Sequence, residues 1–175
     1  MQSIPDAPDP TRRDGIRDRA TLHLCFAGGM RVSELGLRIE DMILQPQASV
    51  LIHGKGRKER CLPLWKETAS AVRAWLSVRG EVRVPELFLN ARREAMTRAG
   101  FEYILRKHVR AAATRCATLS AKRVSPHVLR HTCALTILQA TKDLRKVSLW
   151  LGHSNMQTTE IYTRADPSVK LEALL

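Results

Sequence analysis

The sequence contains no apolar run close to the roughly 20 residues that a membrane-spanning helix needs. Its first residues are polar and rich in proline, and they lack the charged start and apolar centre of a signal peptide. These absences argue against membrane attachment and secretion. We therefore expect a cytoplasmic protein.

Closely spaced cysteines are also missing. The four cysteines, Cys25, Cys61, Cys116 and Cys133, are scattered, and no two of them form the C-x-x-C pair typical of a zinc site. Three of the four have apolar neighbours, which favours reduced, buried thiols. The sequence therefore predicts neither a metal site nor any other cofactor.

Acidic residues are few relative to basic ones. Against 29 lysines and arginines stand only 17 aspartates and glutamates, for a net charge of +12 and a pI of about 10.3. This excess favours a polyanionic partner, above all nucleic acid, although a merely basic soluble protein remains the alternative. A length of 175 residues allows one substantial core and hence one domain.

Residues 1–13 hold three of the eight prolines and are predicted to form a flexible N-terminal arm. From Asp14 apolar residues recur with helical spacing until the Gly28-Gly29 pair, a typical helix stop. Ser33 is a plausible N-cap for a short second helix. Arg31 then lies in the turn between these helices, where it could face a ligand.

Two later segments have the apolar stripe of a surface helix: residues 66–79, and the run from Phe101 to Ala112. His108 lies within the second stripe and is predicted to be structural. Three short apolar runs between Met42 and Pro63 predict strands of a small antiparallel sheet. The expected fold is mostly α with a small three-stranded antiparallel β-sheet, an α+β class.

The predicted turn between the second and third strands is strongly basic. A hairpin tip of this kind suits a DNA groove, but a solvated tip is an equally good interpretation. A second basic stretch, Lys122-Arg123, lies in a predicted loop before Pro126. Both stretches are candidate DNA contacts, and the hairpin contributes Lys55, Arg57, Lys58 and Arg60.

The last quarter of the chain concentrates side chains suited to phosphate chemistry. His127 and Arg130 are three residues apart and share one flank of a helix that Pro126 can open, whereas His131 belongs to its buried stripe. Guanidinium binds phosphate oxygens bidentately, imidazole exchanges protons near neutral pH, and a tyrosine hydroxyl can act as a nucleophile. His153 and Tyr162 follow, with a short helix predicted before each.

These residues resemble the catalytic domain of the tyrosine recombinases, the phage-integrase and Xer-type family. The likeness runs from about Asp14 through most of the chain, and the order of its four boxes is more specific than any one of them. The boxes are Gly29-Met-Arg31-Val-Ser-Glu-Leu35, Gly54-Lys55-Gly-Arg-Lys-Glu-Arg60, Ser125-Pro-His127-Val-Leu-Arg130-His131-Thr132, and Leu151-Gly-His153 with Ile161-Tyr162.

The resemblance implies a tyrosine recombinase catalytic-domain fold over residues 14–175 and metal-free cleavage and rejoining of double-stranded DNA. It assigns Tyr162 as the nucleophile that forms a 3′-phosphotyrosyl link, with Lys55 as general acid. His127 would be a general base or position Tyr162, and the phosphate ligands would be Arg31, Arg130 and His153.

The same resemblance implies a tetramer on DNA, and we expect a monomer in free solution. Family members usually carry an N-terminal core-binding domain, and we expect it to be absent from this chain. Two alternatives keep the fold: a DNA-binding protein without catalysis, and a type IB topoisomerase-like enzyme that relaxes DNA without exchanging partners.

Overall fold

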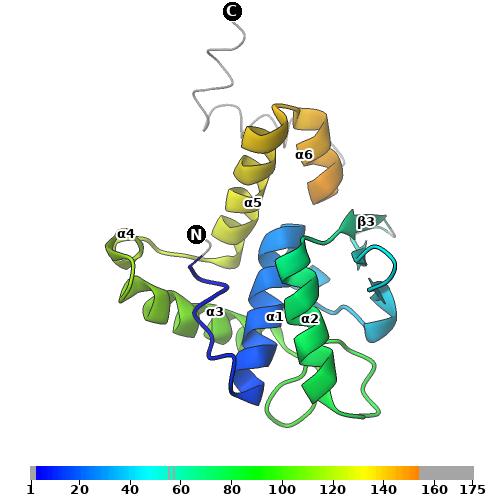
Figure 1. The fold of residues 1–175 in the computed structure, drawn as a ribbon. Helices are drawn as coiled ribbons and strands as arrows, with labels where there is room; N and C mark the ends of the chain where they lie inside the picture. The colour runs from blue at the N-terminus through cyan, green and yellow to red at the C-terminus, as the bar shows by residue number, and fades with distance from the viewer. Residues whose placement is uncertain (1–2, 55, 57, 154–175) are drawn as a thin grey trace, which may run out of the picture.

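The computed structural model describes residues 3–54, 56 and 58–153 (Figure 1). In this part of the chain, helices account for most of the regular structure and a small antiparallel sheet for the rest, so the predicted fold class is confirmed. The helices are α1 (Arg13–Gly28), α2 (Lys66–Arg79), α3 (Arg98–Ala113), α4 (Ala117–Ser120), α5 (Pro126–Thr141) and α6 (Leu144–Leu151).

The sheet has the strand order β1 (Met42–Ile43), β2 (Ser49–His53) and β3 (Glu59–Pro63). Successive side chains of a strand point to opposite faces, and here one face is apolar. Val50 pairs with Leu62, and both are buried. The pairing of β2 with β3 runs from Ser49 opposite Pro63 to His53 opposite Glu59, so the hairpin that joins the two strands follows His53.

Helix α1 packs against α2, also contacts α5, and ends beside the candidate site. Gly29 terminates it with a positive φ of 52°, a conformation that glycine adopts at little cost. The chain then turns into a 3₁₀ helix, η1 (Val32–Glu34), which is capped by Arg31 and not by Ser33 as predicted. The turn begins earlier because the Glu34 carboxylate accepts a hydrogen bond from the Arg31 backbone N–H at 2.8 Å.

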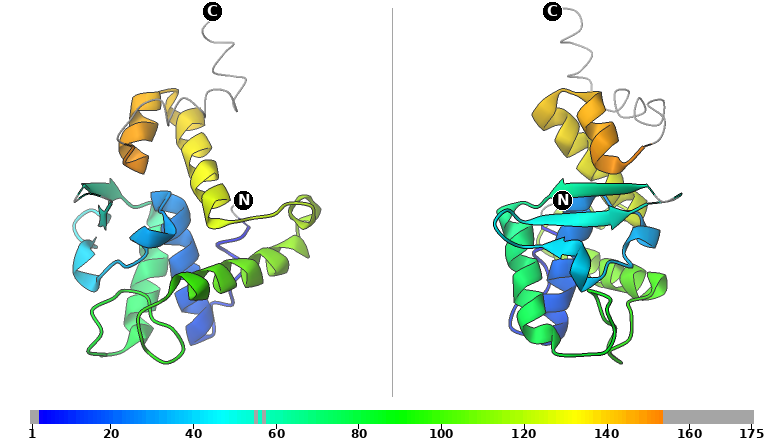
Figure 2. Two further views of the ribbon diagram at one scale, coloured as in Figure 1. Left: turned by 180° about the vertical axis from the view of Figure 1, so that it is seen from behind. Right: turned by 90° about the vertical axis from the view of Figure 1, so that its right-hand side faces the viewer.

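The apolar interior has two parts. The larger contains Trp75, Phe101 and Leu105 and joins α1, α2, α3 and the sheet. The smaller lies between α5 and α6, which stand together at one end of the molecule in both views of Figure 2. Polar contacts connect the two parts, among them a 2.9 Å hydrogen bond from Trp150 Nε1 to the carbonyl oxygen of Ala27.

The N-terminal segment is more closely attached than the sequence predicted. Ile4 is fully buried and belongs to the larger core. Asp6 Oδ1 lies 2.6 Å from Arg19 Nη2 and 3.1 Å from His23 Nε2, and both of these partners belong to α1. The proline content predicted a flexible arm that does not pack, and it gave no sign that one apolar side chain would attach residues 3–12 to the domain.

The four cysteines are free, as expected, but their burial is not uniform. Cys25 and Cys133 are buried, and burial raises the pKa of each thiol to about 12. Cys116 is half-buried and Cys61 is exposed, because its side chain points to the outer face of β3. The prediction of uniformly buried thiols is wrong for these two.

The prediction for His108 is confirmed. It is buried, and its Nε2 atom lies 2.8 Å from Asp18 Oδ2, so the two residues join α3 to α1 in the interior. Within the described residues, no helix is both long enough and apolar enough to cross a membrane.

Candidate active site

A cleft of about 640 Å³ opens between the turn after α1 and the first turn of α5. Arg31 lines it from the first side, and His127 and Arg130 line it from the second. Arg31 precedes the other two residues by about a hundred positions in the sequence. The fold therefore brings together three of the side chains that the sequence predicted for one site.

Two sequence features place the first turn of α5 at the cleft. The Ser125 side chain caps the helix by accepting a hydrogen bond from the Val128 N–H, and Pro126 occupies the first turn, where its missing N–H costs nothing. His127 is exposed there. An exposed imidazole at the lip of the cleft is within reach of solvent and of a ligand.

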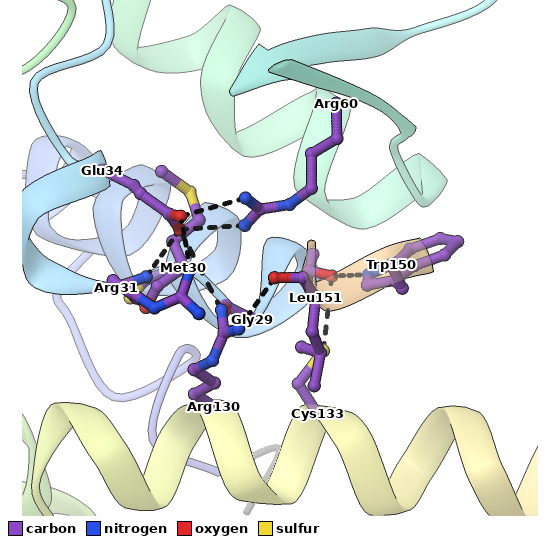
Figure 3. A network of polar contacts seen from close by, with 11 residues as sticks. Gly29, Met30, Arg31, Glu34, Arg60, Arg130, Cys133, Trp150 and Leu151 are labelled. Carbon is purple, nitrogen blue, oxygen red and sulfur yellow. Dashed lines mark hydrogen bonds and ion pairs between the residues drawn. The ribbon is translucent and has the colours of Figure 1, made fainter. Parts of the chain in front are cut away.

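Arg130 is more deeply placed than its predicted position on the helix flank. Only 5% of the residue is exposed, and its guanidinium donates hydrogen bonds to the carbonyl oxygens of Gly29 and Leu151 (Figure 3). These carbonyls belong to the ends of α1 and α6. Arg130 therefore joins three helices while its guanidinium is held at the wall of the cleft.

Glu34 is the centre of the polar network behind the cleft. Its buried carboxylate accepts hydrogen bonds from Arg31 Nη1 at 3.0 Å and from both Nη atoms of Arg60 at 3.0 and 2.8 Å, and it lies 4.0 Å from Arg130 Nη1 (Figure 3). Burial would raise the pKa of Glu34, but hydrogen bonds from Arg60 and from the Arg31 backbone outweigh burial and hold the pKa below 4.5. Glu34 is therefore charged at neutral pH.

His153 follows the end of α6, where Gly152 takes a left-handed turn with a φ of 64°. Burial, followed by the charges of Arg130, Arg31 and Arg60, lowers the pKa of His153 to about 4. The imidazole is therefore neutral at pH 7. A neutral imidazole can still donate one hydrogen bond to a phosphate oxygen.

The predicted DNA contacts separate into three groups. Lys58, Lys122 and Arg123 are exposed, and Arg123 also lines the cleft. Arg60 differs from the prediction: its side chain is only 10% exposed and points inward to Glu34, because Arg60 lies in β3 and not at the hairpin tip. Three predicted site residues, Lys55, Arg57 and Tyr162, lie outside the described residues.

Sequence reasoning missed two contributions to this region. Glu34 is part of the first arginine box, but its role depends on contacts with β3 that no local pattern reveals. The second contribution comes from α3, whose Arg98 and Arg106 line the same cleft. Their spacing of eight residues places them on one helix face, which is a signal that the sequence did contain.

The arrangement is suited to binding an anion. Arg31, Arg123 and Arg130 line one cleft, and the neutral His153 adds a hydrogen-bonding group close to Arg31 and Arg130. Guanidinium groups recognise phosphate oxygens bidentately and stabilise charge that develops on them. Among the residues that the structure describes, no three His, Cys, Asp or Glu side chains come together in the manner of a metal site.

Comparison with known proteins places this chain in a family. The model of the phage integrase family matches residues 1–168. The chain is 41% identical over 171 residues to y4rC of Sinorhizobium fredii, which is named as an integrase/recombinase, covering 96% of this chain and 51% of that protein. It is 40% identical over 169 residues to the tyrosine recombinase XerD of Pseudomonas aeruginosa, covering 93% and 53%.

Solved structures agree. The XerA recombinase superposes with a TM-score of 0.81 at 28% identity, over 98% of this chain and 60% of that one. The XerH site-specific recombinase, solved in a post-cleavage complex with its difH substrate, gives a TM-score of 0.80 at 31% identity, over 99% and 49%. The chain spans about half the length of the curated relatives it matches. From the matched model, the sequence identities and the shared fold, this chain belongs to the phage integrase family of tyrosine recombinases.

Proposed function

We propose that this chain is the catalytic part of a site-specific DNA recombinase that cleaves and rejoins strands without a metal ion. The observation that carries the proposal is that Arg31, His127 and Arg130 line one cleft, although about a hundred positions separate Arg31 from the other two in the sequence. The XerH structure with cleaved DNA is a relative in which the same fold holds such a substrate.

In the proposed reaction, the hydroxyl oxygen of Tyr162 attacks a backbone phosphorus atom and gives up its proton, with His127 as general base or as the group that positions Tyr162. The bond from phosphorus to the 5′-oxygen breaks as the bond to tyrosine forms. Lys55 donates a proton to the departing 5′-oxygen. The number of phosphate ester bonds is unchanged, so a second 5′-hydroxyl can reverse the step and rejoin a strand.

Arg31 and Arg130 would bind the non-bridging oxygens, where negative charge increases in the transition state. The fixed guanidinium of Arg130 supports this role, because a donor that is already oriented needs no rearrangement during the reaction. His153 would donate a hydrogen bond as a neutral imidazole, which agrees with its lowered pKa.

Double-stranded DNA is the proposed partner, in the cytoplasm. Lys58, Lys122 and Arg123 are exposed and available for phosphate contacts, and Arg57 of the hairpin is proposed to join them. Arg98 and Arg106 of α3 extend this basic surface along the cleft. We propose a monomer in free solution and a tetramer on DNA.

Supercoiled plasmid tests the proposal and separates it from its alternatives. In EDTA, the chain should convert supercoiled DNA into relaxed, sealed circles, and DNA carrying two target sites should yield joined recombinants. Relaxation without joined products at any site pair would indicate a topoisomerase. Unchanged topology despite binding would indicate a protein that only occupies DNA, and nicked products that require a metal would indicate a nuclease.

A further inference from the structure

Arg60 is a buried cation that the proposed reaction does not use. It lies in β3 opposite Ile52, and its guanidinium makes a two-point ion pair with Glu34 (Figure 3). This ion pair links β3, the strand after the hairpin, to η1, the 3₁₀ helix after Arg31. Both Nη atoms donate to Glu34 and only 10% of the side chain is exposed, so little of Arg60 is left for contact with DNA.

The other side of Arg60 contacts the turn that precedes His153. A Cβ atom added to Gly152 would lie 3.1 Å from Arg60 Nη1 and 3.2 Å from Arg60 Cδ, so the guanidinium occupies the space above this glycine. Gly54 is also near, since a Cβ atom there would lie 3.8 Å from Glu34 Oε1 and 4.0 Å from Arg60 Nη1. Arg60 therefore lies at the meeting point of the segments that lead into Lys55, Arg31 and His153.

The charge of Arg60 matters as much as its position. The Glu34 carboxylate pairs with Arg31 and lies 4.0 Å from Arg130 Nη1, and both arginines are proposed ligands of a DNA phosphate. A buried carboxylate competes with phosphate for these cations. With Arg60 present, the group formed by these four side chains has a formal charge of +2, and without it the charge would be +1.

Stability alone does not account for an arginine here. The Nε–H group of Arg60 is buried and has no hydrogen-bond partner within the described structure. An unsatisfied buried donor costs free energy, and apolar residues of similar size often replace buried ion pairs without loss of stability. A requirement for positive charge at this point explains why that cost is tolerated.

We propose that Arg60 is a positioning residue of the active-site cleft: it offsets the negative charge of Glu34, so that the positive charges of Arg31 and Arg130 remain available to the scissile phosphate. This role rests on the proposed function. Arg60 does not touch the phosphate itself. It acts through Glu34 and, by filling the space above Gly152, through the turn that carries His153.

The test compares four proteins with wild type: Arg60→Gln, Arg60→Lys, the double variant Glu34→Gln/Arg60→Gln, and Arg12→Gln as a control. Arg12 is a matched surface arginine, paired with Asp14 and 71% exposed in its side chain. The first measurement is an NMR titration of His153 in the free protein, with its signal assigned from His153→Gln. Loss of one nearby positive charge should raise the pKa of His153 in Arg60→Gln, because Arg31, Arg60 and Arg130 are the charges that lower it.

The double variant distinguishes an effect of the Arg60 charge from an effect of its packing. It removes one positive and one negative charge, so it should return the His153 titration toward the wild-type value, and Arg60→Lys should keep it there. A merely structural residue would give the opposite pattern, with the double variant as perturbed as Arg60→Gln or more so. An unchanged pKa of His153 in Arg60→Gln, or a pKa that does not return toward the wild-type value in the double variant, would overturn the proposal. Should Arg60→Gln fail to fold, the His153 titrations of Arg60→Lys and the double variant are compared in its place.

The second measurement is single-turnover cleavage of a nicked duplex. Arg60→Gln should lower the rate about 10- to 100-fold, by analogy with the loss that follows removal of a side chain that orients a metal ligand. The double variant should recover part of this loss, and Arg12→Gln should match wild type. If wild type itself does not cleave, the proposed function fails, whereas the His153 titration still decides the role of Arg60.

Discussion

Replacing Arg130 with alanine should damage the fold as well as the chemistry. Its guanidinium donates hydrogen bonds to the carbonyl oxygens of Gly29 and Leu151, and the residue is 95% buried because only 5% of it is exposed. Arg130→Ala therefore leaves two carbonyl groups without these donors at the junction of α1, α5 and α6. It also removes a contact between the two parts of the apolar interior.

The size of the effect follows from these two bonds. A hydrogen bond that involves a charged group contributes about 1.5 to 3 kcal/mol, so the loss of both should cost about 3 to 6 kcal/mol of unfolding free energy. For a chain of this length, each kcal/mol lowers Tm by about 2 to 4 °C, which gives a decrease of about 6 to 24 °C. Water entering the site would place the result at the lower end of this range.

Urea unfolding followed by circular dichroism measures this cost, with Arg98→Ala as the control. Arg98 also lines the cleft, but its ion pair with Glu102 is exposed and should contribute no more than about 0.5 kcal/mol. Cleavage is then compared at a temperature where all proteins are folded, and Arg130→Ala should still be slower than wild type by about 10²- to 10³-fold. Equal unfolding midpoints for the two variants would refute the structural role that we assign to Arg130.

Three further predictions concern pH, metals and DNA affinity. His153 binds a proton near pH 6.5 in the unfolded chain but only near pH 4 in the folded protein. The unfolding free energy should therefore fall as the pH decreases from 6.5 to 4. Over this range, the urea midpoint of His153→Gln should decrease less than that of wild type. EDTA should leave cleavage of a nicked duplex unchanged, whereas complete loss of cleavage that magnesium restores would contradict cationic side chains as the source of charge. DNA binding measured by fluorescence anisotropy should weaken steeply with salt, to a dissociation constant of about 10⁻⁴ to 10⁻⁶ M at physiological salt. Arg57→Ala should weaken binding further, with a smaller effect on single-turnover cleavage. Tight, sequence-selective binding at that salt would be inconsistent with contacts mainly to phosphates.

Local patterns predicted those parts of the fold that local physics determines. The Gly28-Gly29 stop, the helix start at Pro126 and the helix over residues 66–79 all appear as expected, because local backbone preferences and apolar spacing act within a few residues. The short apolar runs became a sheet with alternating burial for the same reason.

Contacts between distant segments explain what the sequence could not predict. Arg60 appeared to be a hairpin cation, but the register of β3 turns it inward to a carboxylate 26 residues away. Arg130 appeared to lie on a helix flank, yet the ends of α1 and α6 close over it. Such pairings depend on how elements pack, and the sequence of one element does not record the position of its neighbours.

The central claim is that the arginine and histidine cleft holds a DNA phosphate for attack by Tyr162. Its most direct test uses a nicked duplex from which the short 5′-hydroxyl product diffuses away, so that any covalent intermediate accumulates. Wild type should form a protein-linked DNA strand in EDTA, with the link mapped to Tyr162. Tyr162→Phe should bind the same duplex with nearly unchanged affinity and form no adduct, whereas an adduct with Tyr162→Phe, or none with wild type, would contradict the claim.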